Sequence, residues 1–153
     1  MDETGEADER RDPRSYPHWA VDSVRFSDQD AVGHVNNVAI AAYVETGRVA
    51  FGHQLHVGGD PGSSFILARL VIDYRAQAHY PGGIRVGTRL LRVGRTSFTV
   101  GHGVFKDETC IATAEGVLVH TRDGAPAPIE GAFRDELEQS LAGTSRNAGL
   151  RTP

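Results

Sequence analysis

Hydrophobic residues recur with a helical period in residues 37–52. One stripe of this segment consists of Ile40, Tyr43, Val44, Gly47 and Phe51, and small residues, mostly alanine, surround it. Apolar residues three and four positions apart indicate a helix that packs against a core. We therefore predict a largely enclosed helix, roughly 24 Å long. Gly47 costs about 1 kcal/mol relative to alanine in a helix interior, so we expect another element to pack closely against it.

After the turn at residues 58–62, the period of the apolar positions changes to two, first in residues 66–75. Further strand patterns cover residues 84–93, 97–106 and 110–121, and an earlier one covers Trp19–Phe26. Short turns, such as Pro81-Gly82-Gly83, separate the later strands and favour an antiparallel meander. Phe133, Leu137 and Leu141, spaced by four, indicate a short C-terminal helix. One enclosed helix beside a long antiparallel run predicts an α+β fold whose sheet wraps around the helix.

The length of 153 residues suits one domain with one core. Residues 1–15 are dominated by charge and contain almost no apolar side chains, so we expect a disordered tail there. Residues 143–153 have a similarly loose composition and are expected to form a flexible C-terminal tail. The domain is therefore predicted to span residues 16–142.

Composition excludes several classes of protein. The chain has 16 basic and 20 acidic residues, a formal net charge of −4, and no positive stripe, which argues against nucleic-acid binding. Cys110 is the only cysteine, so an intramolecular disulfide and a cysteine-rich zinc site are both excluded, and a reducing cytoplasm fits. The longest apolar run, Val38–Val44, is far shorter than a membrane span of roughly 20 residues. We expect a soluble cytoplasmic protein that does not associate with membranes. Because the histidines lack metal-like spacing, we assign no metal, and we assign no cofactor.

The most informative stretch is SDQDAVGHVNN, residues 27–37, which directly precedes the predicted helix. A purely structural interpretation is available, since such residues cap helices, accept loop hydrogen bonds and permit a positive φ. A functional interpretation uses the same geometry. The start of a helix has unpaired N–H groups and a partial positive charge, which can polarise a carbonyl and hold an oxyanion. Asp30 lies a few residues earlier and is a candidate general base, or a nucleophile that forms a mixed anhydride.

Two segments carry a resemblance to a known family. They are VRFSDQDAVGHVNNVAIAAYVETGR and IDYRAQAHYPGGIRVGTRLLRVGRTSFTVGHGVFKDETCIATAEGVLVHT. Together with their surroundings, roughly residues 18–128, they resemble the hotdog-fold acyl-CoA thioesterases of the 4-hydroxybenzoyl-CoA thioesterase-like family. The resemblance implies hydrolysis of acyl-CoA, or of an acyl carrier protein thioester, with Asp30 as the catalytic carboxylate. It also implies that the Asn37 amide polarises the thioester carbonyl while Gly33 and His34 shape the loop. Two protomers would join their sheets and complete each other's site, as a homodimer or within a homotetramer.

A second hotdog branch places its carboxylate on the central helix, about two turns after the oxyanion amide. Glu45 lies eight residues after Asn37 and matches that spacing. The structural alternative for Glu45 is an i,i+3 ion pair with Arg48. We prefer Asp30 as the catalytic carboxylate.

The phosphates of CoA require basic side chains. Arg92, Arg95 and Lys106 are expected to cluster around the later hairpin, where Thr96 and Ser97 can donate hydrogen bonds. Each of these charges has the alternative of being a solvated charge at a strand edge. The chain also departs from the family pattern, because residues 79–83 read His-Tyr-Pro-Gly-Gly where relatives often carry Gly-Asp.

Two other functions stay open. A hotdog hydratase or dehydratase needs a carboxylate and a histidine acting together, and Asp30 with His34 is a candidate pair. A module that binds acyl-CoA or acyl carrier protein without turnover is the non-enzymatic alternative. Retention of both Asp30 and the helix-start motif favours the thioesterase.

Overall fold

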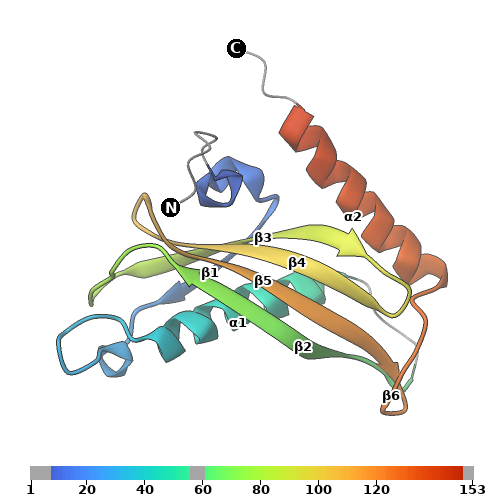
Figure 1. Ribbon diagram of the computed structural model, residues 1–153, viewed down its shortest axis with the longest axis horizontal. Coiled ribbons are helices and arrows are strands. Elements are labelled where there is room, and N and C mark those ends of the chain that lie inside the picture. Colours follow the sequence, from blue (N-terminus) through green and yellow to red (C-terminus); the bar gives the residue numbers. More distant parts are fainter. Residues whose placement is uncertain (1–7, 56–60, 150–153) are drawn as a thin grey trace.

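The computed structural model describes residues 8–55 and 61–149, and Figure 1 shows their arrangement. The strands are β1 His18–Ser23, β2 Ser63–Tyr74, β3 Gly83–Val93, β4 Ser97–Lys106, β5 Thr109–Arg122 and β6 Ala125–Pro126. The helices are α1 Asn37–Gln54 and α2 Gly131–Gly149, and the 3-10 turns are η1 Glu9–Arg11, η2 Pro13–Ser15 and η3 Phe26–Asp28.

One antiparallel sheet curls around α1, which lies on its inner face (Figure 1). The main strands follow the order β1-β3-β4-β5-β2, and β6 pairs with β5. Strands β3, β4 and β5 form the predicted meander, and β2 joins the far side of β5 as an edge strand. The α+β prediction is therefore confirmed, with the sheet wrapped around the helix as in a hotdog fold.

The predicted apolar stripe of α1 faces the sheet. Tyr43, Val44 and Phe51 are almost fully buried. A Cβ atom at Gly47 would meet the Cβ of Val86 at 3.1 Å and the Oγ1 of Thr88 at 3.2 Å. Gly47 therefore permits the close packing that we expected, because a larger residue would push α1 away from β3.

The enclosure of α1 is less complete than predicted. Val38 is 80% exposed and Val49 is 47% exposed, and Ala42 and Glu45 between them are exposed too. These positions share the side of the helix that points away from the sheet. The small apolar residues on that side account for the difference, since periodicity cannot tell a covered apolar face from an open one.

A buried polar group lies beneath the middle of α1. His102 of β4 is 1% exposed, and its Nδ1 lies 2.9 Å from the Oγ1 of Thr88. Burial, and then the nearby positive charge of Arg48, lower the pKa of His102 to about 3. The histidine is therefore neutral at physiological pH, as expected for an imidazole in the core.

The chain leaves β1 earlier than predicted. The strand expected over Trp19–Phe26 ends at Ser23, and η3 follows. The backbone N–H of Arg25 donates to the Oδ2 of Asp28 at 2.8 Å. This side-chain bond closes the turn, because it gives the backbone an alternative to the sheet.

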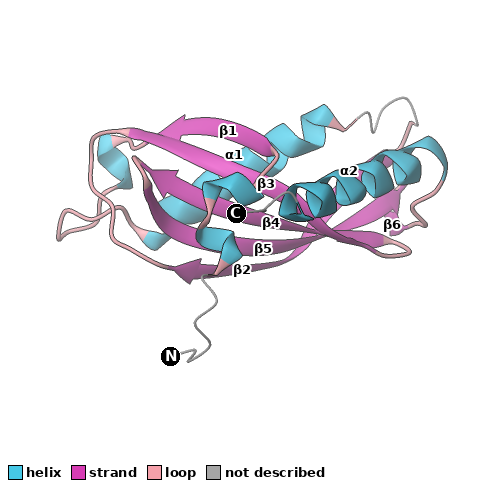
Figure 2. Cartoon of the chain, turned by 90° about the horizontal axis from the view of Figure 1, so that it is seen from above, coloured by secondary structure: helices cyan, strands magenta, loops and turns pink. Residues whose placement is uncertain are grey.

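The two ends of the domain differ in how they meet the sheet. Residues 8–15 form η1 and η2 and lead to Tyr16, which is buried. Helix α2 extends the predicted C-terminal helix and packs beside β3, beyond Thr88, where β1 no longer pairs (Figure 2). The domain limits at residues 16 and 142 stay a prediction.

No helix in the described part of the chain combines the length and hydropathy needed to cross a membrane.

Candidate active site

The loop at residues 30–34 is a tight turn built around the Asp30 carboxylate. The backbone N–H of Asp30 donates to the carbonyl of His34 at 2.7 Å, and Gly33 adopts a positive φ of 80°. The Oδ1 of Asp30 accepts the backbone N–H of Val32 at 2.9 Å and that of His34 at 3.0 Å. These bonds, first of all the one from His34, lower the pKa of Asp30 below its ordinary value. Asp30 is exposed, so it presents a fixed, ionised carboxylate to solvent.

Neighbouring elements hold this loop in place. The backbone N–H of Asn36 donates to the carbonyl of Asp28 at 2.8 Å, and that of Val35 donates to Ala78 at 2.8 Å. The hydroxyl of Tyr43, on α1, donates to the Oδ2 of Asp28 at 2.6 Å. Burial, and then this bond to a carboxylate, raise the pKa of Tyr43, which stays protonated and donates. The loop is thus attached to the helix on one side and to residues after β2 on the other.

The start of α1 places backbone amides beside the loop. Asn36 is the N-cap, and its Oδ1 accepts the backbone N–H of Ala39 at 2.7 Å. Within residues 8–55 and 61–149, no acceptor lies on the backbone amides of Asn37 and Val38. The amide of Asn37 therefore has the hydrogen-bonding capacity that an oxyanion requires, at the positive end of the helix.

A cleft of about 360 Å³ brings the predicted residues together. Asp30, His34 and Asn37 line it from the loop and the helix start. Gly33 contributes through the shape of the backbone only. The remaining lining residues are Val35, Ile40, Tyr74, Arg75, Ala76 and Gln77.

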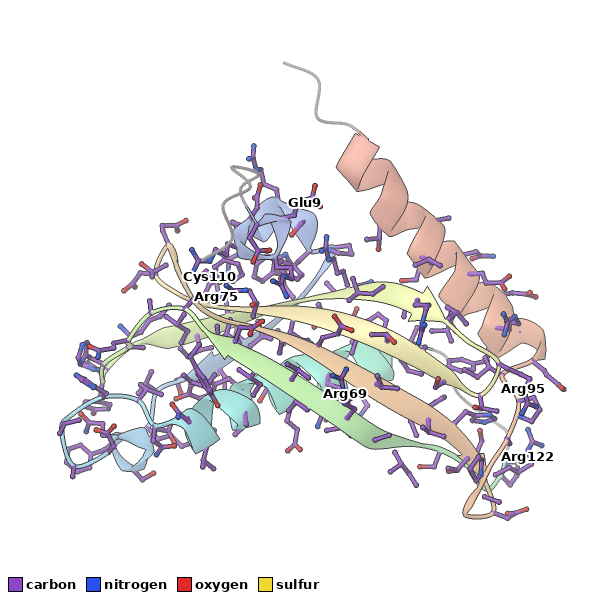
Figure 3. All side chains as sticks on the ribbon, viewed as in Figure 1. Glu9, Arg69, Arg75, Arg95, Cys110 and Arg122 are labelled. Carbon is purple, nitrogen blue, oxygen red and sulfur yellow. The ribbon has the colours of Figure 1, made fainter. Side chains whose placement is uncertain are left out.

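The last residue of β2 and the three residues after it, 74–77, line the cleft but were not identified as part of this site from the sequence. Tyr74 donates its hydroxyl toward the carbonyl of Asn37, at a long 3.4 Å. Arg75, labelled in Figure 3, also lines the cleft. Its Nη2 donates to the Oδ2 of Asp8 at 2.9 Å and its Nε donates to the Oγ1 of Thr113 at 3.1 Å. The alternating pattern of β2 predicted a strand here, but it carried no signal about which loop the strand would approach.

Glu45 lies outside the cleft. Its Oε2 is 3.2 Å from the Nη2 of Arg48, and the Glu45 side chain is 65% exposed. The i,i+3 ion pair that we gave as the structural alternative is therefore present, and Glu45 does not line the site of Asp30 and Asn37.

The residues predicted to contact CoA do not form one cluster. Arg92, Arg95, Thr96 and Ser97 lie together where β3 turns into β4. Lys106 lies at the other end of β4, about 30 Å away for a strand of this length. The prediction that Lys106 joins Arg92 and Arg95 is wrong, because a ten-residue strand separates its two ends. The loop before α1, which carries Asp30, and the turn between β3 and β4, which carries Arg95, also lie at opposite ends of the domain (Figures 1 and 3).

A second cavity, of about 420 Å³, lies at the C-terminal end of α1. Its walls are largely apolar and include Phe51, Leu55, Phe65, Leu67, Phe98 and Leu118. Sequence reasoning did not predict a cavity at this end of the helix. In the part of the chain that the structure describes, no group of three or more metal-ligating side chains is close enough together to hold a metal ion.

Comparisons with solved structures agree with this architecture. A thioesterase from Thermus thermophilus, crystallised with coenzyme A and Zn, is 30% identical, and the match covers 84% of this chain and 97% of the other with a TM-score of 0.74. A protein from Bacillus stearothermophilus, described as a predicted thioesterase, is 26% identical over 81% and 96% of the two chains, with a TM-score of 0.73. A thioesterase superfamily protein from a Jannaschia species is 25% identical over 88% and 85%, with a TM-score of 0.70.

No curated protein matches the sequence. The family model of the thioesterase-like superfamily matches residues 24–137, which include the Asp30 loop, α1 and the meander. Because this match covers most of the chain and the solved relatives share its fold, the chain belongs to the thioesterase-like superfamily.

Proposed function

We propose that the protein is an acyl-CoA thioesterase that hydrolyses a thioester to a free acid and CoA. The observation that carries this proposal is the shared cleft, which both Asp30 and Asn37 line. The carboxylate of Asp30 is ionised, and the backbone amide of Asn37 has no acceptor among the residues that the structure describes. These are the two groups that thioester hydrolysis needs, one to activate or replace the attacking water and one to hold the oxyanion.

In the proposed reaction, the thioester carbonyl accepts a hydrogen bond from the Asn37 amide. Water attacks the carbonyl carbon while Asp30 takes its proton, and the tetrahedral intermediate then expels the CoA thiolate. Direct attack by Asp30, followed by hydrolysis of the mixed anhydride, uses the same two groups. A general base contributes about 10²- to 10⁴-fold to the rate, and one oxyanion donor about 10²- to 10³-fold.

The choice of CoA as the carrier is supported by the Thermus thermophilus thioesterase, which was crystallised with coenzyme A. In this chain, Arg92, Arg95, Thr96 and Ser97 are the candidates to bind the phosphates of CoA. Their distance from Asp30 within one chain suggests that they serve the cleft of a second protomer.

The outer edge of β2 supports such a pairing. Within the described residues no strand pairs with this edge, and the nearby side chains of Ile66 and Val71 are exposed. Ser63, the first residue of β2, lies at the same end of the sheet as Ser97. Tyr74, the last residue of β2, lies at the opposite end, near Asn37. If two copies of β2 pair antiparallel, the Ser97 end of one protomer lies beside the Asp30 end of the other.

The test is release of free thiol from a panel of benzoyl-, phenylacetyl-, short-chain and long-chain acyl-CoA substrates. The wild type is compared with Asp30→Asn, whose amide oxygen can still accept the loop amides, and with Glu45→Gln as the matched control. We expect Asp30→Asn to lose at least about 100-fold in kcat and Glu45→Gln to stay within about twofold of the wild type. Full turnover by a folded Asp30→Asn protein would overturn the proposal.

Hydration of an enoyl thioester is the second candidate function. The side chains of Asp30 and His34 line the same cleft, which is the arrangement that this chemistry requires. Loss of the ultraviolet absorbance of a 2-enoyl-CoA without thiol release would establish hydration, whereas thiol release establishes hydrolysis. Tight acyl-CoA binding with neither reaction would indicate a binding module.

A further inference from the structure

The segment after β2 supplies a histidine that contacts the Asp30 loop from outside the cleft. The Nδ1 of His79 lies 3.1 Å from the carbonyl oxygen of Gly33. We propose that His79 is a positioning residue, which holds the Asp30 carboxylate in its reactive orientation through the peptide bond between Gly33 and His34. This inference rests on the proposed function, since it assigns His79 a role in the same site.

One peptide group connects the two side chains. A carbonyl oxygen only accepts, so the Nδ1 of His79 carries the hydrogen and donates to Gly33. The N–H of the same peptide, which belongs to His34, donates to the Oδ1 of Asp30 at 3.0 Å. Hydrogen bonds in series polarise one another, so a donor on the carbonyl strengthens the N–H as a donor to the carboxylate. His79 thus acts on Asp30 without touching it.

Two further contacts fix the same part of the loop. The rings of His79 and His34 meet edge to face, with centroids 5.0 Å apart and planes at 71°. The backbone N–H of Val35 donates to the carbonyl of Ala78, next to His79, at 2.8 Å. Residues 78 and 79 therefore lie against residues 33–35 at three points: a backbone bond, a side-chain bond and a ring contact.

The position of His79 separates it from the catalytic groups. His79 is exposed and does not line the cleft, whereas His34 does. A replacement at this exposed position leaves the core intact, so its effect on turnover reports on the loop.

Three substitutions test the role of the Nδ1 donor. His79→Leu removes every donor, His79→Asn places an amide nitrogen near the position of Nδ1, and His79→Gln places one near that of Nε2. We expect His79→Leu and His79→Gln to lower kcat about fivefold or more, the equivalent of one hydrogen bond, with KM nearly unchanged. His79→Asn should restore kcat to within about twofold of the wild type, and Gln139→Leu, on an exposed site of α2, should not change it.

A second measurement does not depend on activity. Hydrogen–deuterium exchange of the amides of Val32 and His34, which bond to Asp30, should be about fivefold faster in His79→Leu and unchanged in His79→Asn. If the wild type hydrolyses no thioester, the proposed function fails, and the exchange rates still decide the role of His79. Wild-type kcat and exchange in His79→Leu would overturn the inference. Equal defects in the Leu and Asn variants would also overturn it, because the Nδ1 donor would then not be the cause.

Discussion

The hydroxyl of Tyr43 donates a hydrogen bond of 2.6 Å to the carboxylate of Asp28, and so joins the buried face of α1 to the loop that carries Asp30. Asp28 is only two residues from Asp30, yet its side chain is turned toward the protein and not toward the cleft. It accepts from Tyr43 and from the backbone of Arg25, while its own carbonyl accepts from Asn36. The two acidic residues of this short motif therefore have different roles. Asp28 holds the loop in place, and Asp30 is the proposed reactive group.

Replacement of Tyr43 by phenylalanine tests this attachment. The substitution keeps the ring but removes the donor to a charged group, so we expect a loss of about 1.5–3 kcal/mol in the free energy of unfolding. Chemical denaturation measures it. Tyr74→Phe is the matched control, because the bond from Tyr74 to Asn37 is long at 3.4 Å and exposed. Equal losses of unfolding free energy in the two variants would show that the Tyr43–Asp28 bond does not stabilise the protein more than the long bond of Tyr74 does.

Two glycines of α1 should respond oppositely to alanine. At Gly47 the new methyl group meets Val86 and Thr88, so we expect Gly47→Ala to destabilise the protein by about 1–3 kcal/mol. At Gly52 no atom lies within 4 Å of the new methyl group, so Gly52→Ala should stabilise it by up to about 1 kcal/mol through helix propensity. Thermal unfolding of both variants gives the two signs, and a stabilised Gly47→Ala protein would contradict the close packing of α1 on β3.

His102 should make folding sensitive to acid. Its pKa is about 3 in the folded protein, below the ordinary value of 6.5, so the unfolded chain takes up the proton first as the pH falls. The stability due to neutral His102 is complete above pH 6.5 and is lost toward pH 3, at up to about 1.4 kcal/mol per pH unit.

Urea denaturation between pH 7 and pH 4 measures this slope. His102→Asn, whose side-chain amide can form a hydrogen bond with the Thr88 hydroxyl in place of Nδ1, should show a shallower slope than the wild type. His53→Asn, at an exposed position of α1, should keep the wild-type slope. A steep slope that persists in His102→Asn would assign the acid sensitivity to other groups.

Mixed oligomers test whether two protomers share each site. The Asp30→Asn variant lacks the reactive carboxylate but keeps an intact β3–β4 turn. The double variant Arg92→Ala/Arg95→Ala lacks the basic side chains of that turn but keeps Asp30. If the turn of one protomer serves the cleft of its partner, refolding the two inactive variants together should restore about a quarter of the wild-type turnover, because half of the dimers are mixed and each has one intact site.

The same mixture distinguishes the alternative arrangement. If each chain uses its own turn and its own Asp30, no combination of the two variants contains an intact site, and turnover stays at the level of the separate variants. Light scattering before and after mixing confirms that the oligomeric state is unchanged.

Local sequence was enough to predict the central helix, the long strands and the importance of the loop at residues 30–34. The period of 3.6 identified α1, and the period of two identified the long strands. The residue types before the helix are ones that cap helices, and Asn36 is the N-cap in the structure. The loop at residues 30–34 closes on itself, since both amides that bond to Asp30 come from within four residues of it. Interactions over such short separations are encoded in the order of the residues and need no knowledge of the rest of the fold.

Only the tertiary structure decided what surrounds that loop. His79 contacts the loop at Gly33 from 46 residues away in the sequence, and Tyr74 contacts the adjacent start of α1 at Asn37 from 37 residues away. Both contacts depend on how β2 and the segment after it run along the sheet. The same holds for Lys106, which lies close to Arg95 in the sequence but at the opposite end of β4. A periodic pattern states which positions are apolar and how the chain is locally shaped. Which distant segments meet depends on strand pairing and helix packing, because those arise from the joint burial of surfaces contributed by the whole chain.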